Sequence, residues 1–298
     1  MTVTDVDNWR NLRDGRWPSW EGEAMSEPGA NETAGLIGST ARIATWNVWG
    51  NFGPWRDRYA VIEAVLRDAN PDVICLQEAW RDGDYDAAEV LAASRGYDQT
   101  ATIEWFEPLK LASGIAILSR WKIVRSEDLR LPPEGRGSGA VFQFAELAGP
   151  RGVILVFNAM LDWRPDQSHI RQRQVERLCG WIREHRVRGA SVVLCGDFNA
   201  VPDSDEIRML TGKSKPPAPG LVFYDTWDAI RPDERGFTWS NTNAYAKASP
   251  RSDGRIDYIF SAWGGQAGRG QPTACGLLGV DADRIGSDHF GVWADLRY

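Results

Sequence analysis

The chain lacks the features that mark membrane proteins and disulfide-stabilised domains. In its 298 residues no stretch approaches the ~20 apolar residues of a membrane-spanning helix, and the first residues contain no apolar signal-peptide core. None of the four cysteines forms a CxxC pair, and Cys75 and Cys195 lie inside apolar runs, where a free thiol behaves as a small hydrophobe. We therefore expect reduced cysteines and a cytoplasmic protein without a membrane span.

The chain also lacks an excess of basic residues. It has 34 Lys and Arg against 41 Asp and Glu, for a net charge of −7, and no long basic helix or Lys/Arg-rich loop. Proteins that grip long nucleic acids usually carry a basic face, because neutralising phosphates supplies most of that affinity. The charge balance favours a small phosphorylated partner and disfavours long DNA, although a nucleic-acid substrate stays open. The sequence does not fix the oligomeric state.

The regular pattern begins near Ala41. Residues 1–38 are polar, show no sustained period and predict a flexible or loosely docked extension, whereas residues 39–298 predict a single domain. Helical spacing of apolar residues predicts helices at 56–68, 85–94 and 166–185. Apolar runs predict strands at 42–49, 73–78, 114–118, 141–147, 153–158, 192–195, 255–260 and 290–296. Helices interleaved with such strands imply sheets that are covered by helices.

Acidic residues sit where several of the apolar runs end. Glu78 follows Val73–Leu76 and Asp197 follows Val192–Cys195, with Asp257 and Asp288 in two further motifs. Carboxylates are poor strand formers and poor core residues, so their position needs a reason. The ends of neighbouring strands can hold several acids within reach of one divalent cation, and a nearby histidine can then transfer protons. The pattern predicts a metal site that acts on a phosphate.

Six motifs occur in an order that resembles the endonuclease/exonuclease/phosphatase superfamily, which includes pancreatic deoxyribonuclease and sphingomyelinases. They are Thr45-Trp46-Asn47-Val48, Leu76-Gln77-Glu78, Gly114 to Arg120, Gly196-Asp197-Phe198-Asn199, Arg255-Ile256-Asp257-Tyr258 and Ser287-Asp288-His289. The resemblance implies an α/β fold, a four-layer sandwich of two mixed β-sheets flanked by helices, with the site at one edge. It also implies a divalent-metal-dependent hydrolase of phosphodiester, pyrophosphate or phosphomonoester bonds.

The resemblance also assigns the metal ligands. Glu78 matches the principal ligand, Asn47 lies beside it, and Asp288 completes the carboxylate side. Oxygen ligands of this kind suit Mg²⁺ or Mn²⁺. The alternative for Glu78 is a charged residue that merely ends a strand in water.

Five further residues match the family's catalytic positions. His289 matches the proton-transferring histidine and Asp257 the carboxylate that holds its ring. Asp197 would orient or deprotonate the attacking water, a role that stays open to His289 as well, while Asn158 and Asn199 would hold the phosphate. A core histidine and a simple Gly-Asp-Phe-Asn turn are the structural alternatives.

Substrate contacts are expected around these motifs. Thr238-Trp239 resembles the family's aromatic segment on the substrate side, although a core position for Trp239 is an equal alternative. Arg164 lies in a predicted rim loop, as do three further cations that are candidates for a second phosphate: Arg136, Lys247 and Arg251.

One position departs from the family's pattern. Where the family usually shows Asn-x-His-Leu, this chain has Asn158-Ala159-Met160-Leu161, so Met160 replaces a histidine that donates to the scissile phosphate. A thioether has no proton to give, so Met160 would be a substrate contact without a donor role. Three explanations stay open: substrates with good leaving groups, a binding role or a specialised non-hydrolytic biosynthetic reaction, or an introduced substitution.

Overall fold

The computed structural model describes residues 35–83, 85–106, 111–187, 189–264 and 266–298, which contain two β-sheets. The seven-stranded sheet has the order β12 (Pro272–Leu278), β13 (Gly291–Arg297), β1 (Thr40–Asn47), β2 (Val73–Asp82), β5 (Leu111–Ser119), β4 (Asp98–Phe106), and β3 (Tyr85–Asp86) pairs with β2. The six-stranded sheet has the order β10 (Phe223–Asp225), β11 (Asp257–Ala262), β9 (Ser191–Asp197), β8 (Gly152–Met160), β7 (Ala140–Gly149), β6 (Ile123–Leu131). Both sheets mix parallel and antiparallel pairs.

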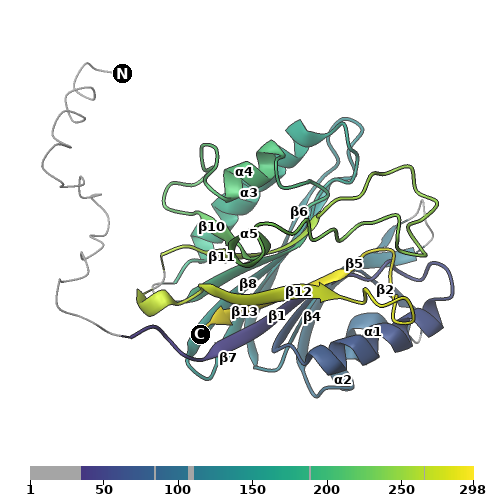
Figure 1. Ribbon diagram of the computed structural model, residues 1–298, viewed down its shortest axis with the longest axis horizontal. Coiled ribbons are helices and arrows are strands. Elements are labelled where there is room, and N and C mark those ends of the chain that lie inside the picture. The colour runs from purple at the N-terminus through teal and green to yellow at the C-terminus, as the bar shows by residue number, and fades with distance from the viewer. Residues whose placement is uncertain (1–34, 84, 107–110, 188, 265) are drawn as a thin grey trace, which may run out of the picture. The chain divides into compact units, whose positions relative to one another are not determined.

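Five α-helices of the described residues accompany the sheets: α1 (Trp55–Ala69), α2 (Ala87–Ala93), α3 (Ser168–His185), α4 (Asp205–Leu210) and α5 (Thr226–Ile230). Figure 1 shows α1 and α2 together beside one sheet and α3 and α4 beside the other. Three buried clusters separate the layers: α1 and α2 pack on the seven-stranded sheet, α3 and α4 on the six-stranded sheet, and the two sheets on each other. The predicted four-layer α/β sandwich is therefore confirmed.

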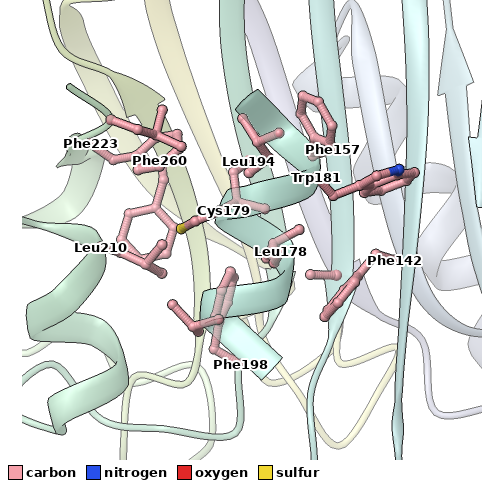
Figure 2. Close-up of a cluster of buried hydrophobic side chains, with 14 of the residues drawn as sticks. Phe142, Phe157, Leu178, Cys179, Trp181, Leu194, Phe198, Leu210, Phe223 and Phe260 are labelled. Carbon is pink, nitrogen blue, oxygen red and sulfur yellow. The ribbon is translucent and has the colours of Figure 1, made fainter. Parts of the chain in front are cut away.

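The core under α3 shows how the helical spacing is used. Val175, Leu178, Cys179 and Ile182 recur at three- and four-residue intervals and are all buried against the six-stranded sheet. Figure 2 shows α3 with Leu178, Cys179 and Trp181 packed among side chains from the strands beneath it. The interior strands are apolar on both faces because each sheet has a helix layer on one side and the other sheet on the other.

Residues 1–34 lie outside the described residues, so the predicted extension over 1–38 stays a prediction. Of its last residues, Ile37 donates from its backbone nitrogen to Ala267 O and accepts from Arg297 Nη1. All four cysteines are free and buried. None of the helices in the described ranges is long and apolar enough to cross a bilayer.

Strand register brings the predicted motifs to one edge. In the six-stranded sheet Met160 pairs with Asp197, which in turn pairs with Asp257, so the three residues form a row across β8, β9 and β11. Side chains of directly paired residues share a face of the sheet. In the seven-stranded sheet Asn47 pairs with Gln77, immediately before Glu78.

Candidate active site

Asn47 joins the two sheets at this edge. Its Nδ2 donates to Glu78 Oε1 at 3.0 Å and to Asp197 Oδ2 at 3.1 Å, while its Oδ1 accepts from the backbone nitrogen of Trp49. The side chain is fully buried, and both amide hydrogens point at carboxylates. Asn47 therefore fixes the orientation of one acid from each sheet.

Glu78 does not end its strand as the sequence predicted. β2 continues to Asp82, and Glu78 sits at a β-bulge between Gln77 and Ala79 with a φ of 52°. A bulge re-aims a side chain, and a non-glycine residue in the left-handed region costs about 1–3 kcal/mol. Trp49 and Asn199 at the same edge also have positive φ, at 57° and 51°. Backbone strain is thus concentrated around the predicted site.

Asp257 and His289 form a buried pair. Asp257 Oδ2 lies 2.9 Å from His289 Nδ1, and the Trp239 ring packs edge-on against the imidazole with centroids 4.9 Å apart. Burial opposes a charge on this ring, but Asp257, Asp288 and Asp197 together outweigh it and raise the pKa of His289 to about 10. With Nδ1 turned to Asp257, Nε2 is the nitrogen left to meet a ligand.

Burial, together with the charges of neighbouring acids, raises the pKa of three carboxyl groups at this edge. Burial, and then the charge of Asp257, raises the pKa of Asp197 from 3.8 to about 6. Burial also raises the pKa of Asp288 from 3.8 to about 6, with Glu78 adding to the shift. The pKa of Glu78 is raised chiefly by burial, with further contributions from Asp197 and Asp257. Four carboxylates thus lie within electrostatic reach of one another.

Asp197 is the last residue of β9, and Asn199 lies in the loop that follows it. Asn199 donates from its backbone nitrogen to Asp197 Oδ1 at 2.9 Å and from Nδ2 to Leu161 O at 3.2 Å, and its Oδ1 accepts from Arg251. The preceding Gly196 has a φ of 146°, and a Cβ there would lie 1.9 Å from the backbone oxygen of Ala159. Glycine is needed at that position for the end of β9 to lie so close to β8.

Asn158 was predicted to hold the phosphate, but its side chain bonds other residues of the protein instead. Its Nδ2 donates to the backbone oxygens of Leu76 and Ala116, and its Oδ1 accepts from Gln77 Nε2 at 2.7 Å. Both amide hydrogens are therefore occupied, and the side chain is fully buried between the sheets. Asn158 braces β2 next to the Glu78 bulge and has no donor left for a phosphate.

The predicted substrate contacts lie at different places. Met160 is partly exposed at the end of β8, opposite Asp197. Trp239 is partly buried against His289. Arg164 lies in the loop after β8 with its guanidinium 4.8 Å from the ring of Trp163. Among the described residues its hydrogen bonds join it to Asp162, Gln167 and Arg171, and none reaches the acid cluster formed by Glu78, Asp197, Asp257 and Asp288.

Arg58 is the residue that the sequence reasoning missed. Its guanidinium is fully buried and donates all five N–H groups to backbone oxygens, those of Val48, Trp49, Gly50, Phe52 and Gly286. It thereby holds the loop after Asn47 against the loop that leads to Asp288. A signal was present, since Arg58 stands four residues before Ile62 in the apolar stripe of α1.

Two further residues position the Ser287-Asp288-His289 segment. Ser287 donates from Oγ to the backbone oxygen of Asn47 at 2.7 Å, and Trp46 donates from Nε1 to the backbone oxygen of His289 at 2.9 Å. The Thr-Trp-Asn and Ser-Asp-His motifs are therefore joined side chain to backbone. Their separation of about 240 residues in sequence hides this from any local pattern.

The donor set fits a hard divalent cation. Glu78, Asp197, Asp257 and Asp288 supply four carboxylates, and the positive charges that act on them are those of His289, Arg58 and Arg251. Asp257 Oδ1 is buried without a hydrogen-bond partner in the part of the chain that the structure describes. Ligand atoms of Asp197, Asp257 and His289 also lie within 4.8 Å of one another. A cation would relieve the repulsion among the carboxylates, and oxygen ligands are those that Mg²⁺ and Mn²⁺ prefer.

Comparison with known sequences decides the family. The sequence profile of the Endonuclease/Exonuclease/phosphatase family matches residues 44–289, which span every motif from the Asn47 strand to His289. The chain belongs to this family. Membership supports a metal-dependent phosphoesterase activity in general. No curated protein matches the chain significantly.

Solved structures share the fold of this family member. TDP2 from D. rerio, solved with a single-strand DNA product, is 22% identical, with a TM-score of 0.70 over 87% of this chain and 100% of that one. An endonuclease/exonuclease/phosphatase from Beutenbergia cavernae is 23% identical, with a TM-score of 0.67 over 87% of this chain and 72% of that one. The human Nocturnin catalytic domain, with a bound sulfate anion, is 20% identical, with a TM-score of 0.64 over 86% and 93%.

Proposed function

We propose that this family member hydrolyses phosphoester bonds in a small phosphorylated molecule with the help of a bound Mg²⁺ or Mn²⁺. The observation that carries the proposal is the meeting of Glu78, Asp197, Asp257 and Asp288 with His289 at one edge of the two-sheet sandwich. Burying carboxylates without a use is costly, so this set favours hydrolysis over a binding role.

Glu78 and Asp288 are the residues that would hold the cation, with Asn47 orienting Glu78 through its 3.0 Å hydrogen bond. His289 fits the ligand set less well, because a ring kept protonated by its neighbours has no lone pair for a metal. When bound, the cation would polarise a phosphoryl oxygen and offset charge on the leaving group.

Asp197 is suited to take a proton from the attacking water. Its pKa of about 6 leaves it ionised near neutral pH and more basic than an ordinary carboxylate. Asn199 and Asn47 hold its two oxygens, which fixes the direction from which it accepts.

His289 is suited to meet the phosphate as an imidazolium. Asp257 fixes the ring, and Nε2–H can donate to a phosphoryl oxygen. The second hydrogen of Asn199 Nδ2 has no acceptor among the described residues and is available to a phosphoryl oxygen.

The preference for a small substrate rests on the net charge of −7. The D. rerio relative was solved with single-strand DNA, so a nucleic-acid end is the alternative. An assay of five substrates, each with Mg²⁺ or Mn²⁺, distinguishes a small substrate from a nucleic acid. The substrates are a phosphomonoester, an aryl phosphodiester, a pyrophosphate, a single-stranded oligonucleotide and plasmid DNA. We expect cation-dependent cleavage of small substrates and slow attack on plasmid at physiological salt. Rapid plasmid degradation would reject the small-substrate preference, and no cleavage of anything would reject the activity.

A further inference from the structure

The four cations that the sequence places on rim loops have different surroundings. Arg136 pairs with Asp166 and is 76% exposed, and Arg164 stacks on Trp163. Lys247 is exposed. Within the described parts of the chain, Arg251 is the one of the four that contacts the loop after Asp197, through a hydrogen bond to Asn199.

Arg251 donates two hydrogen bonds to Asn199 and has further N–H groups without an acceptor among the described residues. Its Nη1 donates to Asn199 Oδ1 at 2.8 Å and its Nη2 donates to Asn199 O at 3.2 Å. A guanidinium has five N–H donors, so three have no acceptor among the residues that the structure describes. Burial dominates the raised pKa of Asp197, and Arg251 is close enough to oppose that rise. A fixed positive charge with free donors therefore lies beside the proposed base.

Met160 also lies next to Asp197 and close to Asn199. Asn199 donates to the backbone oxygen of Leu161, the next residue after Met160, and Met160 itself is the register partner of Asp197. The resemblance puts a phosphate-facing histidine where Met160 stands. The thioether brings neither charge nor proton, while the nearby guanidinium brings charge alone, because arginine stays protonated in proteins.

We propose that Arg251 binds a non-bridging oxygen of the scissile phosphate in place of the histidine that Met160 replaces, and that the site therefore favours phosphoanhydrides and aryl phosphoesters. The inference rests on the proposed function. In the step, the water oxygen bonds to phosphorus and its proton passes to Asp197. The bond from phosphorus to the leaving oxygen breaks, and its electron pair leaves on that oxygen. An aryloxide or phosphate departs in this form, whereas an alkoxide needs a proton that Arg251 cannot give.

Binding of inorganic phosphate tests the contact between Arg251 and the phosphate without requiring turnover. Calorimetric titration in the presence of Mg²⁺ would compare wild type with Arg251→Gln, whose amide keeps a donor for Asn199, and with Arg251→Lys, which keeps the charge. A charge-assisted contact is worth ~1.5–3 kcal/mol, so we expect the affinity to fall about 10- to 100-fold in Arg251→Gln and much less in Arg251→Lys. Lys247→Gln, on the same loop, is the matched control and should bind as wild type.

Equal phosphate affinity in wild type and Arg251→Gln would overturn the contact, as would an equal loss in Lys247→Gln, which would indicate a diffuse effect of charge. Should Arg251→Gln unfold, Arg251→Ala with added guanidinium decides: restored phosphate binding supports the contact, and no restoration by guanidinium opposes it.

The leaving-group preference is tested by the rates of hydrolysis of matched diesters that differ only in an aryl or an alkyl leaving group. We expect wild type to prefer the aryl ester by at least ~10³-fold in kcat/KM, and Arg251→Gln to slow both esters by a similar factor. Rates on the two esters within tenfold of each other would overturn the leaving-group preference. An absence of turnover with Arg251-dependent phosphate binding intact would count against the proposed function alone.

Discussion

Asp257 holds the ring of His289 through a 2.9 Å contact between Oδ2 and Nδ1, and neither side chain is more than slightly exposed. The residues are 32 apart in sequence, and the segments that precede β11 and β13 both pair with Trp239, through Gly254 and His289. The pair is the most directly connected acid–histidine unit at the edge, so its two members should act together.

A double-mutant cycle tests this unit. Asp257→Asn and His289→Ala should each lower kcat/KM, while the double variant should lose less than the sum of the two in free energy. We expect a coupling of ~0.5–3 kcal/mol from steady-state kinetics on one activated substrate. Strictly additive losses would mean that the two residues act separately.

The stability of the metal-free protein should depend on pH through Asp197, Asp288 and His289. Asp197 and Asp288 have pKa values raised from 3.8 to about 6, so the folded state binds these protons more tightly than the unfolded state. In metal-free protein this stabilisation is complete below the unfolded pKa and is lost as the pH rises through 6. His289, raised from 6.5 to about 10, adds stability that is lost between those two values as the pH rises.

A cation needs the ionised acids, so the rise in Tm on adding Mn²⁺ should be larger at about pH 7.5 than at about pH 5. Differential scanning calorimetry with and without Mn²⁺ at the two values measures this. Asp288→Asn should flatten the difference. An equal rise at both values in wild type would argue against Asp288 as a ligand of the cation.

Arg58 should matter for stability more than its place in the sequence suggests. Arg58→Met would leave five backbone oxygens without their donor, three of them around Trp49 and Gly50. An unsatisfied buried group costs ~1–3 kcal/mol, so we expect a loss of more than ~3 kcal/mol in the free energy of unfolding by urea. Arg56→Met, two residues earlier on α1 and exposed, is the matched control and should change little. A loss below 1 kcal/mol in Arg58→Met would contradict this reading.

The interior of the fold could be predicted from the sequence, but its edges could not. Within the described ranges, all eight interior strands lie where apolar runs predicted them, because a strand covered on both faces must be apolar throughout. The strands that the sequence missed include all four sheet edges, β4, β6, β10 and β12. β6 shows why: its Arg, Ser, Glu and Asp residues are exposed, as edge strands require to avoid pairing with other chains.

The site could be predicted as a set of motifs, but not as an arrangement. The acids were found because carboxylates beside apolar runs are unusual, yet the bulge that aims Glu78 is a backbone feature with no side-chain signature. Asn158 was misassigned because an amide between two sheets looks, in sequence, like an amide in a cleft. Arg251 could be listed as a rim cation, but its contact with Asn199 crosses 52 residues of sequence.

Restoring the missing histidine offers a separate test of Met160. Met160→His should raise kcat/KM most for alkyl esters, by tenfold or more, because their leaving oxygen gains from a proton donor worth ~10²–10⁴-fold. Aryl esters and pyrophosphates should gain little, and stability should change by less than ~1 kcal/mol at this partly exposed position. A uniform gain would point to phosphate binding in the ground state, and a loss on every substrate would give Met160 a positive role.

The cation dependence of wild type and Glu78→Gln tests the account most directly. Glutamine keeps the shape and the hydrogen bond to Asn47 while removing the charge that would hold the cation. The measurement is the initial rate of aryl phosphodiester hydrolysis as Mn²⁺ is titrated in. We expect saturable, EDTA-reversible activity in wild type. In Glu78→Gln, the apparent Mn²⁺ affinity should fall by at least ~10- to 100-fold, with an undiminished Tm. Equal Mn²⁺ dependence in the two proteins, or hydrolysis by wild type that EDTA does not stop, would contradict it.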